Sequence, residues 1–573
     1  MSDKKQATKL ETMRHSCSHV LAEAVLEIFP EAKLGIGPAT ADGFYYDFQL
    51  PVPLSEKDLP KIEDRMKAII KNNKAFEKSI ISREEAQKLF KKLEQPLKLE
   101  LIAELPKDDK ITIYRTGNFI DLCRGPHLAS TGKIGPLKLT SIAGAYWRGS
   151  EQNQQLQRIY GTCFNDNSEL SEYLEKLEEA EKRDHRKLGK ALDLYSVSDD
   201  IGPGLILWHP KGSVIRKIIE DFWREEHLKR DYQLVFSPHI ARELIWKKSG
   251  HLDFYSENMF SSFGIEGDHY LIKPMNCPFH IAIYKTHLHS YKDLPIRYAE
   301  LGMVYRYEKS GVLHGLTRVR GFTQDDAHIF CTQGQMEDEL VKTVKLAQFM
   351  LKKFGFKNYK VYLATRPEDF VGKIEIWDKA EKALDSALKK AGVEFQIDDG
   401  EGVFYGPKID IKLEDSLGRL WQGPTIQIDF NEPKKFKVNY TGDDGQEHQA
   451  IMIHRTVLGS MERFFGCLVE HYAGAFPWWL APVQVKVVQI TDRNQKYAKK
   501  IVEELSRRKL RVELDDRNES VGKKIRDAEL EKVPYILVVG DKEEKAESVS
   551  VRKRGSKELK SLKIDKFILQ VTE

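Results

Sequence analysis

Two breaks in the sequence pattern divide this chain into stretches that are each about the size of a domain. Residues 168–192 are charged and carry leucines at helical spacing, which predicts a helix that connects two domains. The second break is the Pro- and Trp-rich stretch 476–482, after which the pattern changes. Since 573 residues are too many for one hydrophobic core, we expect an N-terminal domain over 1–167, a central domain over 193–478 and a C-terminal domain over 479–573.

The three stretches differ in the secondary structure that they predict. The N-terminal stretch mixes amphipathic helices with short strands. In the central stretch, strand-like runs are separated by short turns, which favours an antiparallel sheet over a doubly wound parallel one. In the C-terminal stretch, strands alternate with helices, as in a small α/β domain. The expected fold class is therefore α+β with several domains: an N-terminal α/β domain, a central domain with an antiparallel sheet and a C-terminal α/β domain.

Charge and composition restrict the location of the protein more than its function. Residues 483–573 carry 23 Lys or Arg and 17 Asp or Glu, which is compatible with a polyanionic partner and equally with a solvated helical surface. The polar start of the chain has no apolar segment typical of a secretion signal. No uncharged apolar run is long enough to cross a bilayer, and six cysteines are too few for a disulfide scaffold. We therefore expect a cytoplasmic protein without a membrane partner.

An arginine-rich segment lies in the middle of the central stretch. Arg306, Glu308, Arg318 and Arg320 surround a predicted strand, loop and strand within residues 296–330. Guanidinium groups in such an arrangement could clamp the oxygens of a triphosphate. Most clusters of this kind are surface ion pairs, so both interpretations stay open at this point.

Two sets of Cys and His residues are candidates for metal binding. Cys277, His328 and His454 are too far apart in the sequence for their spacing to identify a metal site. His15 and His19 lie four residues apart on one face of a predicted helix. A Cys-x-x-x-His pair follows in a predicted loop, at Cys123 and His127. This second pattern is compatible with zinc and also with unrelated buried residues.

Three segments of the central stretch resemble the motifs of class II aminoacyl-tRNA synthetases. Residues 306–308, followed by Arg-Gly-Phe-Thr-Gln-Asp-Asp-Ala-His at 320–328, are similar to motif 2 in the form found in threonyl-tRNA synthetases. Residues 458–463, which end in an arginine, resemble motif 3, and residues 214–238 resemble motif 1, the dimer element. The resemblance to the bacterial threonyl-tRNA synthetase family runs from about Lys9 to the C-terminus.

The resemblance implies an enzyme that activates L-threonine with ATP and Mg²⁺, transfers it to tRNA(Thr) and works as a homodimer. Fixed guanidinium groups would stabilise the charge that develops on the phosphate oxygens. Roles carried over residue by residue make Arg306, Arg463 and His251 catalytic, place Glu308, Arg318, Arg320 and Phe322 around ATP, and place Gln324, Asp326, Tyr405, Gln427 and Met275 around threonine.

The same resemblance assigns one zinc ion per subunit to Cys277, His328 and His454. Three protein ligands leave the coordination sphere open, as is typical of a zinc ion that binds a substrate. Threonine and valine are isosteric, and an apolar pocket separates such a pair only about 100-fold. A zinc ion that takes both the amino group and the hydroxyl of threonine as ligands would reject valine, while Asp326 accepts a hydrogen bond from that hydroxyl.

Serine poses a different problem, because it offers the same two ligands and lacks only one methyl group. That difference is worth only about 10- to 200-fold, so we expect a second, hydrolytic site. The resemblance places it in the N-terminal domain, which would hydrolyse seryl-tRNA(Thr) with His15, His19, Cys123, His127, Lys98, Tyr46 and Asp121. We expect a water positioned by histidine rather than a resident metal, although the sequence leaves a metal open.

The C-terminal domain resembles the anticodon-binding domain of class II enzymes, with anticodon contacts at Asn518, Glu543 and Arg552. The family's additional ubiquitin-like N-terminal domain is expected to be absent. Phe279 and Tyr307 also depart from the residues that the family commonly has at these positions.

Three rival functions are an editing protein without aminoacylation, a prolyl- or seryl-specific enzyme, and an RNA-binding regulator. The presence of Arg306, Arg463 and the proposed zinc ligands disfavours the first. The combination of those ligands with the N-terminal His-x-x-x-His module disfavours the second. The third stays open as a second activity.

Overall fold

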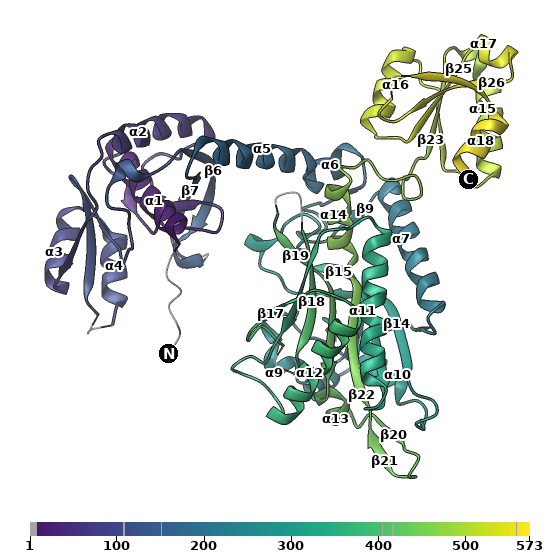
Figure 1. Ribbon diagram of the computed structural model, residues 1–573, viewed down its shortest axis with the longest axis horizontal. Coiled ribbons are helices and arrows are strands. Elements are labelled where there is room, and N and C mark those ends of the chain that lie inside the picture. The colour runs from purple at the N-terminus through teal and green to yellow at the C-terminus, as the bar shows by residue number, and fades with distance from the viewer. Residues whose placement is uncertain are drawn as a thin grey trace. The chain divides into compact units, whose positions relative to one another are not determined.

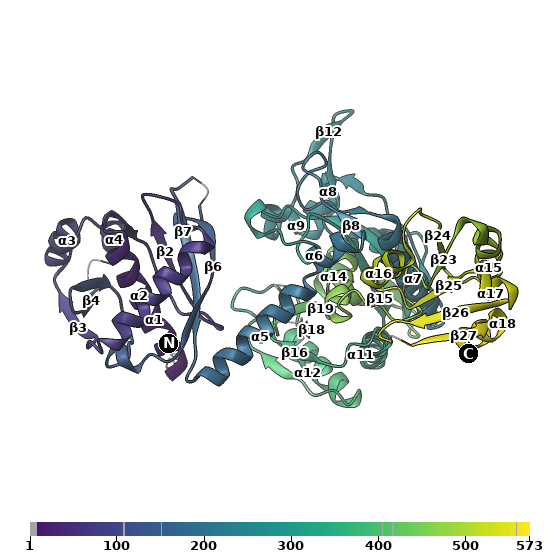
Figure 2. The same ribbon diagram turned by 90° about the horizontal axis from the view of Figure 1, so that it is seen from above.

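The computed structural model describes residues 8–572 except 107–108, 151, 404, 415–417 and 557, and Figures 1 and 2 show it from two sides. The chain divides into two compact units, Met1–Leu177 and Glu178–Glu573. Within the described residues, no helix combines the length and the apolar character that a membrane crossing requires. All six cysteines are free thiols.

The first unit contains a four-stranded antiparallel sheet that shares one hydrophobic core with two helices. The helices are α1 (Lys9–Ile28) and α2 (Leu59–Lys71), and the strands follow the order β1 (Lys33–Leu34), β2 (Phe44–Gln49), β7 (Gln155–Cys163) and β6 (Leu137–Tyr146). Helix α1 begins at Lys9 because Thr8 and Glu11 form a capping box. The same helix carries His15 and His19 one turn apart.

A second, three-stranded antiparallel sheet completes this unit. It consists of β3 (Glu77–Ile81), β4 (Ile111–Thr116) and β5 (Phe119–Leu122), and it packs with α3 (Arg83–Lys92) and α4 (Pro96–Glu104). Asp121 lies on β5, Lys98 lies on α4, and the loop after β5 carries Cys123 and His127. The helix that packs on the first sheet and the elements of the second sheet therefore supply different residues of the predicted His and Cys cluster.

The charged segment 168–192 forms two helices instead of the single helix that the sequence predicted. They are α5 (Asn167–Arg183) and α6 (His185–Ala191). The break occurs at Asp184, whose side chain accepts the backbone N–H of Arg186 and so caps the second helix. A short side chain that competes for backbone hydrogen bonds can interrupt a pattern that otherwise favours a continuous helix.

An eight-stranded sheet forms the middle of the second unit. Its order is β10 (Gln233–Leu234), β14 (Ile296–Tyr305), β15 (Gly321–Cys331), β22 (Ile451–Ser460), β19 (Leu420–Asp429), β18 (Lys408–Glu414), β16 (Tyr359–Ala364) and β17 (Gln396–Asp398). The strands from β14 to β16 pair antiparallel, and only the two edge strands pair parallel with their neighbours. This arrangement confirms the predicted antiparallel class.

The two faces of this sheet have different roles. Helices α11 (Met336–Lys353) and α12 (Ile374–Lys390) lie along one face in Figure 1 and share the main core with Ala327, Ile329 and Ile453. Because side chains alternate along a strand, the residues between these core positions point to the opposite face. That face carries the polar side chains described below.

Further helices and short strands surround the sheet in the second unit. They are β8 (Tyr195–Ser196), β9 (Leu207–Trp208), α7 (Pro210–Leu228), β11 (Ile240–Arg242), α8 (Glu243–Ser249), α9 (His251–Phe254), β12 (Phe263–Ile265), β13 (Asp268–Ile272), α10 (Cys277–Tyr284), α13 (Asn431–Phe436), β20 (Asn439–Thr441), β21 (Glu447–Gln449) and α14 (Met461–His471).

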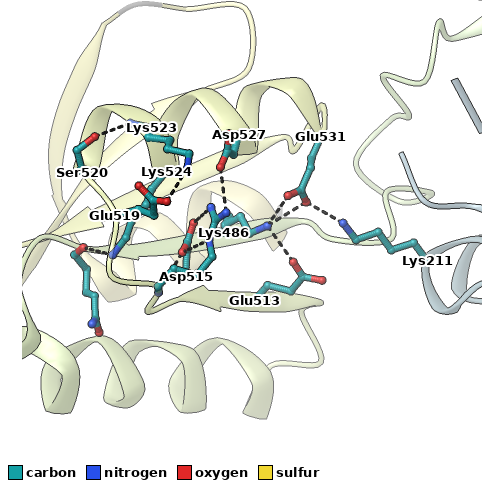
Figure 3. Close-up of polar contacts among 12 residues, drawn as sticks. Lys211, Lys486, Glu513, Asp515, Glu519, Ser520, Lys523, Lys524, Asp527 and Glu531 are labelled. Carbon is teal, nitrogen blue, oxygen red and sulfur yellow. Dashed lines mark hydrogen bonds and ion pairs between the residues drawn. The ribbon is translucent and has the colours of Figure 1, made fainter. Parts of the chain in front are cut away.

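The C-terminal part of this unit contains a five-stranded sheet, whose strands are visible in Figure 2. Its order is β24 (Val512–Asp515), β23 (Val485–Gln489), β25 (Tyr535–Val539), β26 (Ser548–Lys553) and β27 (Leu559–Lys563), and its helices are α15 (Gln495–Arg507), α16 (Val521–Leu530), α17 (Asp541–Lys545) and α18 (Ile564–Thr572). Glu531 accepts from Lys486 at 2.9 Å and from Lys211, which lies on α7, at 2.8 Å; Figure 3 draws both contacts. An ion-paired network therefore links this sheet to α7.

Candidate functional site

One face of the central sheet gathers polar side chains from four neighbouring strands. In the register, Glu300 on β14 pairs with Asp326 on β15, and His328 on β15 pairs with His454 on β22. His454 in turn pairs with Gln427 on β19. These side chains lie in adjacent rows because the sheet register aligns strands that are distant in sequence.

A cavity of about 500 Å³ opens over this face. Most of the residues predicted to bind substrates line it: His251, Met275, Cys277, Arg306, Glu308, Arg318, Phe322, Gln324, Asp326, His328, Tyr405, Gln427, His454 and Arg463. Arg320 is not among the described residues that line this cavity. Its guanidinium Nε instead donates to the backbone carbonyl of Glu308 at 2.9 Å.

Cys277, His328 and His454 come together at one end of the cavity. Cys277 is the first residue of α10, and the two histidines are partners on β15 and β22. One ligand atom from each of the three lies within 4.8 Å of the others. The structure thus assembles three donors that the sequence spacing left unconnected.

The chemistry of this donor set fits a zinc ion, since one thiol and two imidazoles are preferred zinc ligands. Burial lowers the pKa of His328, so its imidazole stays neutral, which is the form that binds a metal. Beside the cluster, Glu432 Oε1 accepts from Cys277 Sγ at 3.8 Å. Glu432 Oε2 is buried and has no hydrogen-bond partner among the described residues, which is costly unless a ligand or ion compensates.

The neighbouring polar groups are held by hydrogen bonds. Asp326 accepts from the amide of Asn276 at 3.2 Å, and Tyr405 donates its hydroxyl to Gln427 Oε1 at 2.7 Å. His251 lies at the edge of the cluster, where its Nε2 is 3.0 Å from the Met275 sulfur. This end of the cavity therefore presents oriented donors and acceptors to a small polar ligand.

The other end of the cavity is rich in arginine. Arg463 donates to the carbonyl oxygens of Thr317 at 2.9 Å and Gln422 at 3.2 Å, and Arg306 donates to that of Pro274 at 3.4 Å. Within the described part of the chain, neither Arg306 nor Arg463 forms an ion pair. Burial and the nearby arginines lower the pKa of Arg463, so this end of the cavity carries uncompensated positive charge that favours an anionic ligand.

The other residues predicted around ATP lie near these two arginines. Arg318 forms an ion pair with Glu308 at 3.1 Å. The guanidinium of Arg306 lies 5.1 Å from the centre of the Phe322 ring, within the range of a cation–π contact.

The first unit contains the second predicted cluster. His15, His19, Cys123 and His127 offer ligand atoms that lie within 4.8 Å of one another. The Cys123 sulfur is 3.3 Å from the Nε2 atoms of both His15 and His127. A hollow of about 230 Å³ lies beside His15, so a ligand has room next to the cluster.

A group of buried, hydrogen-bonded side chains lies next to this cluster. Lys98 Nζ lies 2.6 Å from Asp121 Oδ1, and Tyr46 donates its hydroxyl to Asp121 Oδ2 at 2.6 Å. His19 Nε2 lies 3.6 Å from the same carboxylate. Lys98, Tyr46, Asp121 and His19 thus form one connected group, and the ring contact of His19 with His127, at 4.2 Å between centroids, joins this group to the rest of the cluster.

Burial sets the protonation of this cluster. It raises the pKa of the Cys123 thiol to about 12 and lowers the pKa values of His15, His19 and His127. At neutral pH the thiol is therefore protonated and the imidazoles are neutral. Neutral imidazoles can accept a proton from water, whereas a protonated thiol is a poor nucleophile.

The three residues predicted to contact an anticodon are not joined to one another by any contact among the described residues. Asn518 is exposed in the loop after β24. Glu543 accepts from the Gly540 backbone at 3.0 Å and from Ser550 at 2.9 Å, and Arg552 forms an ion pair with Glu529.

Sequence reasoning missed several buried polar residues around the cavity, namely Asn276, Asp325, Asp429 and Glu432. The Asp325 carboxylate accepts backbone N–H groups of residues 457–459, and so fixes the chain that leads to α14. Asp429 Oδ2 lies 3.1 Å from His454 Nε2. Adjacent acids within a predicted strand, as at Asp325 and Asp326, are a signal that could have been used, since a buried carboxylate must be hydrogen-bonded.

Comparisons with known proteins agree with this geometry. Residues 261–472 match the tRNA synthetase class II core domain (G, H, P, S and T), residues 483–573 match the anticodon binding domain, and residues 111–160 match the threonyl and alanyl tRNA synthetase second additional domain.

Whole proteins that are similar to this chain include threonine–tRNA ligases. A threonine–tRNA ligase from Dehalococcoides mccartyi is 56% identical over 100% of this chain and 99% of its own length. One from Aquifex aeolicus is 52% identical over 98% of this chain and 89% of its own length. A solved structure of the RNA binding domain of threonyl-tRNA synthetase from Cryptosporidium parvum is 40% identical, with a TM-score of 0.65, over 68% of this chain and 98% of that one.

Proposed function

The chain belongs to the threonine–tRNA ligase family of class II aminoacyl-tRNA synthetases, and on that premise we propose which reaction each of its two sites catalyses. In the cavity over the central sheet, the carboxylate of threonine attacks the α-phosphorus of ATP and releases pyrophosphate. A terminal ribose hydroxyl of tRNA(Thr) then attacks the carbonyl carbon of the adenylate and releases AMP.

The observation that carries this proposal is a pair of arginines that form no ion pair with any described residue, in a cavity that also holds a thiol and two imidazoles. We assign Arg306 to the α-phosphate and Arg463 to the γ-phosphate, because fixed cations stabilise the charge that develops there. Glu308, Arg318 and Phe322 line the part of the cavity that takes the nucleotide, and Arg320 supports them through the Glu308 backbone carbonyl. Mg²⁺ accompanies ATP, as in other phosphate-displacement reactions.

Cys277, His328 and His454 hold a zinc ion in this proposal. A zinc ion with an open position supplies Lewis-acid sites for an amine and a hydroxyl. Asp326 accepts from the threonine hydroxyl, Gln324, Tyr405, Gln427 and Met275 line the amino acid, and His251 faces the tRNA ribose. The half-buried Asp326 disfavours valine, since a methyl group cannot donate the hydrogen bond that the threonine hydroxyl gives to this carboxylate.

The His and Cys cluster of the first unit hydrolyses seryl-tRNA(Thr). Neutral imidazoles accept a proton from an attacking water, while Lys98, Tyr46 and Asp121 fix the position of the cluster. The four donors also lie close enough together to hold a metal. Metal analysis of variants of this cluster, made in the isolated first unit, distinguishes a bound metal from a water positioned by histidine.

Three further assignments rest on similarity and surface chemistry. Asn518, Glu543 and Arg552 contact the anticodon in this proposal. The exposed side chains of Phe236, within motif 1, and of Leu244, shortly after it, are 78% and 71% exposed and favour a homodimer contact. Free cysteines throughout favour the reducing cytoplasm.

ATP–pyrophosphate exchange tests the activation step. Threonine should support exchange, serine should support it weakly and valine should not. A zinc chelator should abolish the threonine signal, and added zinc should restore it. Exchange with valine at a rate comparable to threonine would refute the role of the metal cluster.

A further inference from the structure

A second histidine stands directly behind the proposed metal ligand His328. His280 lies on α10, three residues after Cys277, and has no exposed surface. Its Nδ1 lies 2.8 Å from Nδ1 of His328, and the two rings meet at 86°. Its Nε2 lies 3.1 Å from Glu300 Oε2. Glu300, His280 and His328 therefore form a continuous buried chain of hydrogen bonds.

The direction of these hydrogen bonds follows from the chemistry of the groups. Two ring nitrogens can share one hydrogen bond only if one of them carries a proton and the other does not. Since an ionised carboxylate only accepts, a neutral His280 carries its proton on Nε2, and its Nδ1 is the acceptor. His328 must then carry its proton on Nδ1, which leaves the lone pair on its Nε2.

Glu300 is fixed as an acceptor by its other contacts. Its Oε1 accepts the backbone N–H of Ser237 at 2.8 Å, and its Oε2 accepts the Ser237 hydroxyl at 2.8 Å. Lys273 Nζ lies 3.8 Å away. Although burial favours the neutral acid, the contacts with His280, Lys273 and Ser237 lower the pKa of Glu300, so it stays ionised at neutral pH.

We propose that Glu300 and His280 are positioning residues that hold His328 in the tautomer whose Nε2 is available to a metal ion. The inference rests on the proposed zinc site. His328 Nε2 is the ring atom next to Asp326, whose Oδ1 is 3.9 Å away, so the available lone pair lies on the side of the threonine contacts. Residues that orient a metal ligand in this way typically change metal affinity roughly 10- to 100-fold when they are altered.

Local structure explains why these residues are well placed. Cys277 and His280 are three residues apart on α10 and so lie on one face of the helix, which supplies one proposed ligand and the support of another. Glu300 is the strand partner of Asp326, and His328 lies two residues beyond Asp326 on the same face. One helix and two strands thus fix the whole chain of hydrogen bonds.

The substitution Glu300→Gln separates this role from packing because it keeps the size of the side chain. The backbone N–H of Ser237 can only donate, so the amide oxygen of glutamine must face it. The amide NH₂ then faces His280 Nε2, which must become an acceptor. His280 would carry its proton on Nδ1, opposite the proton of His328 Nδ1, and the required tautomer would lose its support.

Zinc affinity is measured on the full-length enzyme by competition with a chromophoric chelator, for wild type, Glu300→Gln, His280→Ala and His280→Asn. We expect Glu300→Gln and His280→Ala to weaken zinc binding roughly 10- to 100-fold. His280→Asn should lose less, because its amide oxygen can replace the acceptor Nδ1. The zinc content and threonine-dependent exchange of the wild type are measured first, since their absence would refute the metal site itself.

Glu339→Gln is the matched control, because Glu339 is a buried carboxylate paired with Arg297 at 2.6 Å in the same unit and touches none of these residues. It should leave zinc affinity unchanged. Unchanged affinity in Glu300→Gln would overturn the proposal. An equal loss in Glu300→Gln and Glu339→Gln would also overturn it, because the loss would then reflect general damage to the core.

Discussion

Removal of the Lys98 amine tests how the proposed editing cluster is held together. Lys98 Nζ lies 2.6 Å from Asp121 Oδ1, and both side chains are 2% exposed. At this distance and an effective dielectric constant of about 20, the Coulomb attraction is roughly 6 kcal/mol, part of which offsets the cost of dehydrating both charges. Lys98→Met leaves the Asp121 carboxylate buried without its counter-charge. We therefore expect it to lower the free energy of unfolding of the first unit by about 3–5 kcal/mol.

Lys98→Met should also affect hydrolysis of seryl-tRNA(Thr) and threonine-dependent pyrophosphate exchange differently. Lys98 is one of the groups that lower the pKa of His19, after burial and His15, so its removal raises that pKa and favours the protonated imidazole, which cannot accept a proton from water. We expect hydrolysis of seryl-tRNA(Thr) to fall. Threonine-dependent pyrophosphate exchange should be unchanged, because the residues that perform it lie in the second unit.

Lys138→Met is the matched control, since Lys138 is 45% exposed and pairs with Glu63 at 3.2 Å in the same unit. Glu63 is buried but keeps Lys67 as a second partner at 2.8 Å, so removal of the half-exposed Lys138 should cost only about 0–1 kcal/mol. The double variant Lys98→Met/Asp121→Asn removes both buried charges and should recover part of the lost stability. Denaturation with urea, followed by hydrogen exchange in the first unit, measures these differences. A cost for Lys98→Met no larger than that for Lys138→Met, or no recovery in the double variant, would refute the reasoning.

Three further outcomes are expected from the geometry of the two sites. Arg463→Met should slow exchange by about 100- to 1000-fold, as is typical when one fixed donor to developing charge is lost, while the zinc content stays the same; a smaller loss would contradict its assignment to ATP. Cys123→Ala should keep most of the seryl-tRNA hydrolysis, because burial raises the thiol pKa to about 12 and no thiolate is present; loss of hydrolysis with an intact fold would contradict this reasoning. Since burial lowers the pKa values of His19 and His127 from 6.5, both stay neutral as the pH falls through 6.5, and a pH profile of hydrolysis should show no decline there.

The elements of the fold were predictable where local pattern and tertiary burial agree. Strand β25 (Tyr535–Val539) is one of the strands expected in the C-terminal stretch, because it is a short apolar run between turns and its residues after the first are buried. The single helix predicted over 168–192 was wrong, since the capping hydrogen bond of Asp184 depends on backbone geometry that charge patterning does not encode. The order of the central sheet was not predictable, because β22 lies between β15 and β19 although it comes last of the three in sequence.

Two pairs of histidine and glutamate illustrate which contacts of the site could not be predicted from the sequence. His280 contacts Glu300, and His185 contacts Glu470 through Nδ1 at 2.7 Å; both pairs are buried, and neither has a distinctive sequence context. The two pairs differ in the third residue that each histidine contacts. His185 Nε2 accepts the backbone N–H of Leu316 at 3.0 Å, so that pair ties a loop to α14, whereas His280 faces another imidazole whose remaining nitrogen lies next to Asp326. Sequence resemblance identifies residues that touch the substrate, but the direction of a hydrogen bond through an intermediate residue follows only from the register of strands and helices that are distant in the chain.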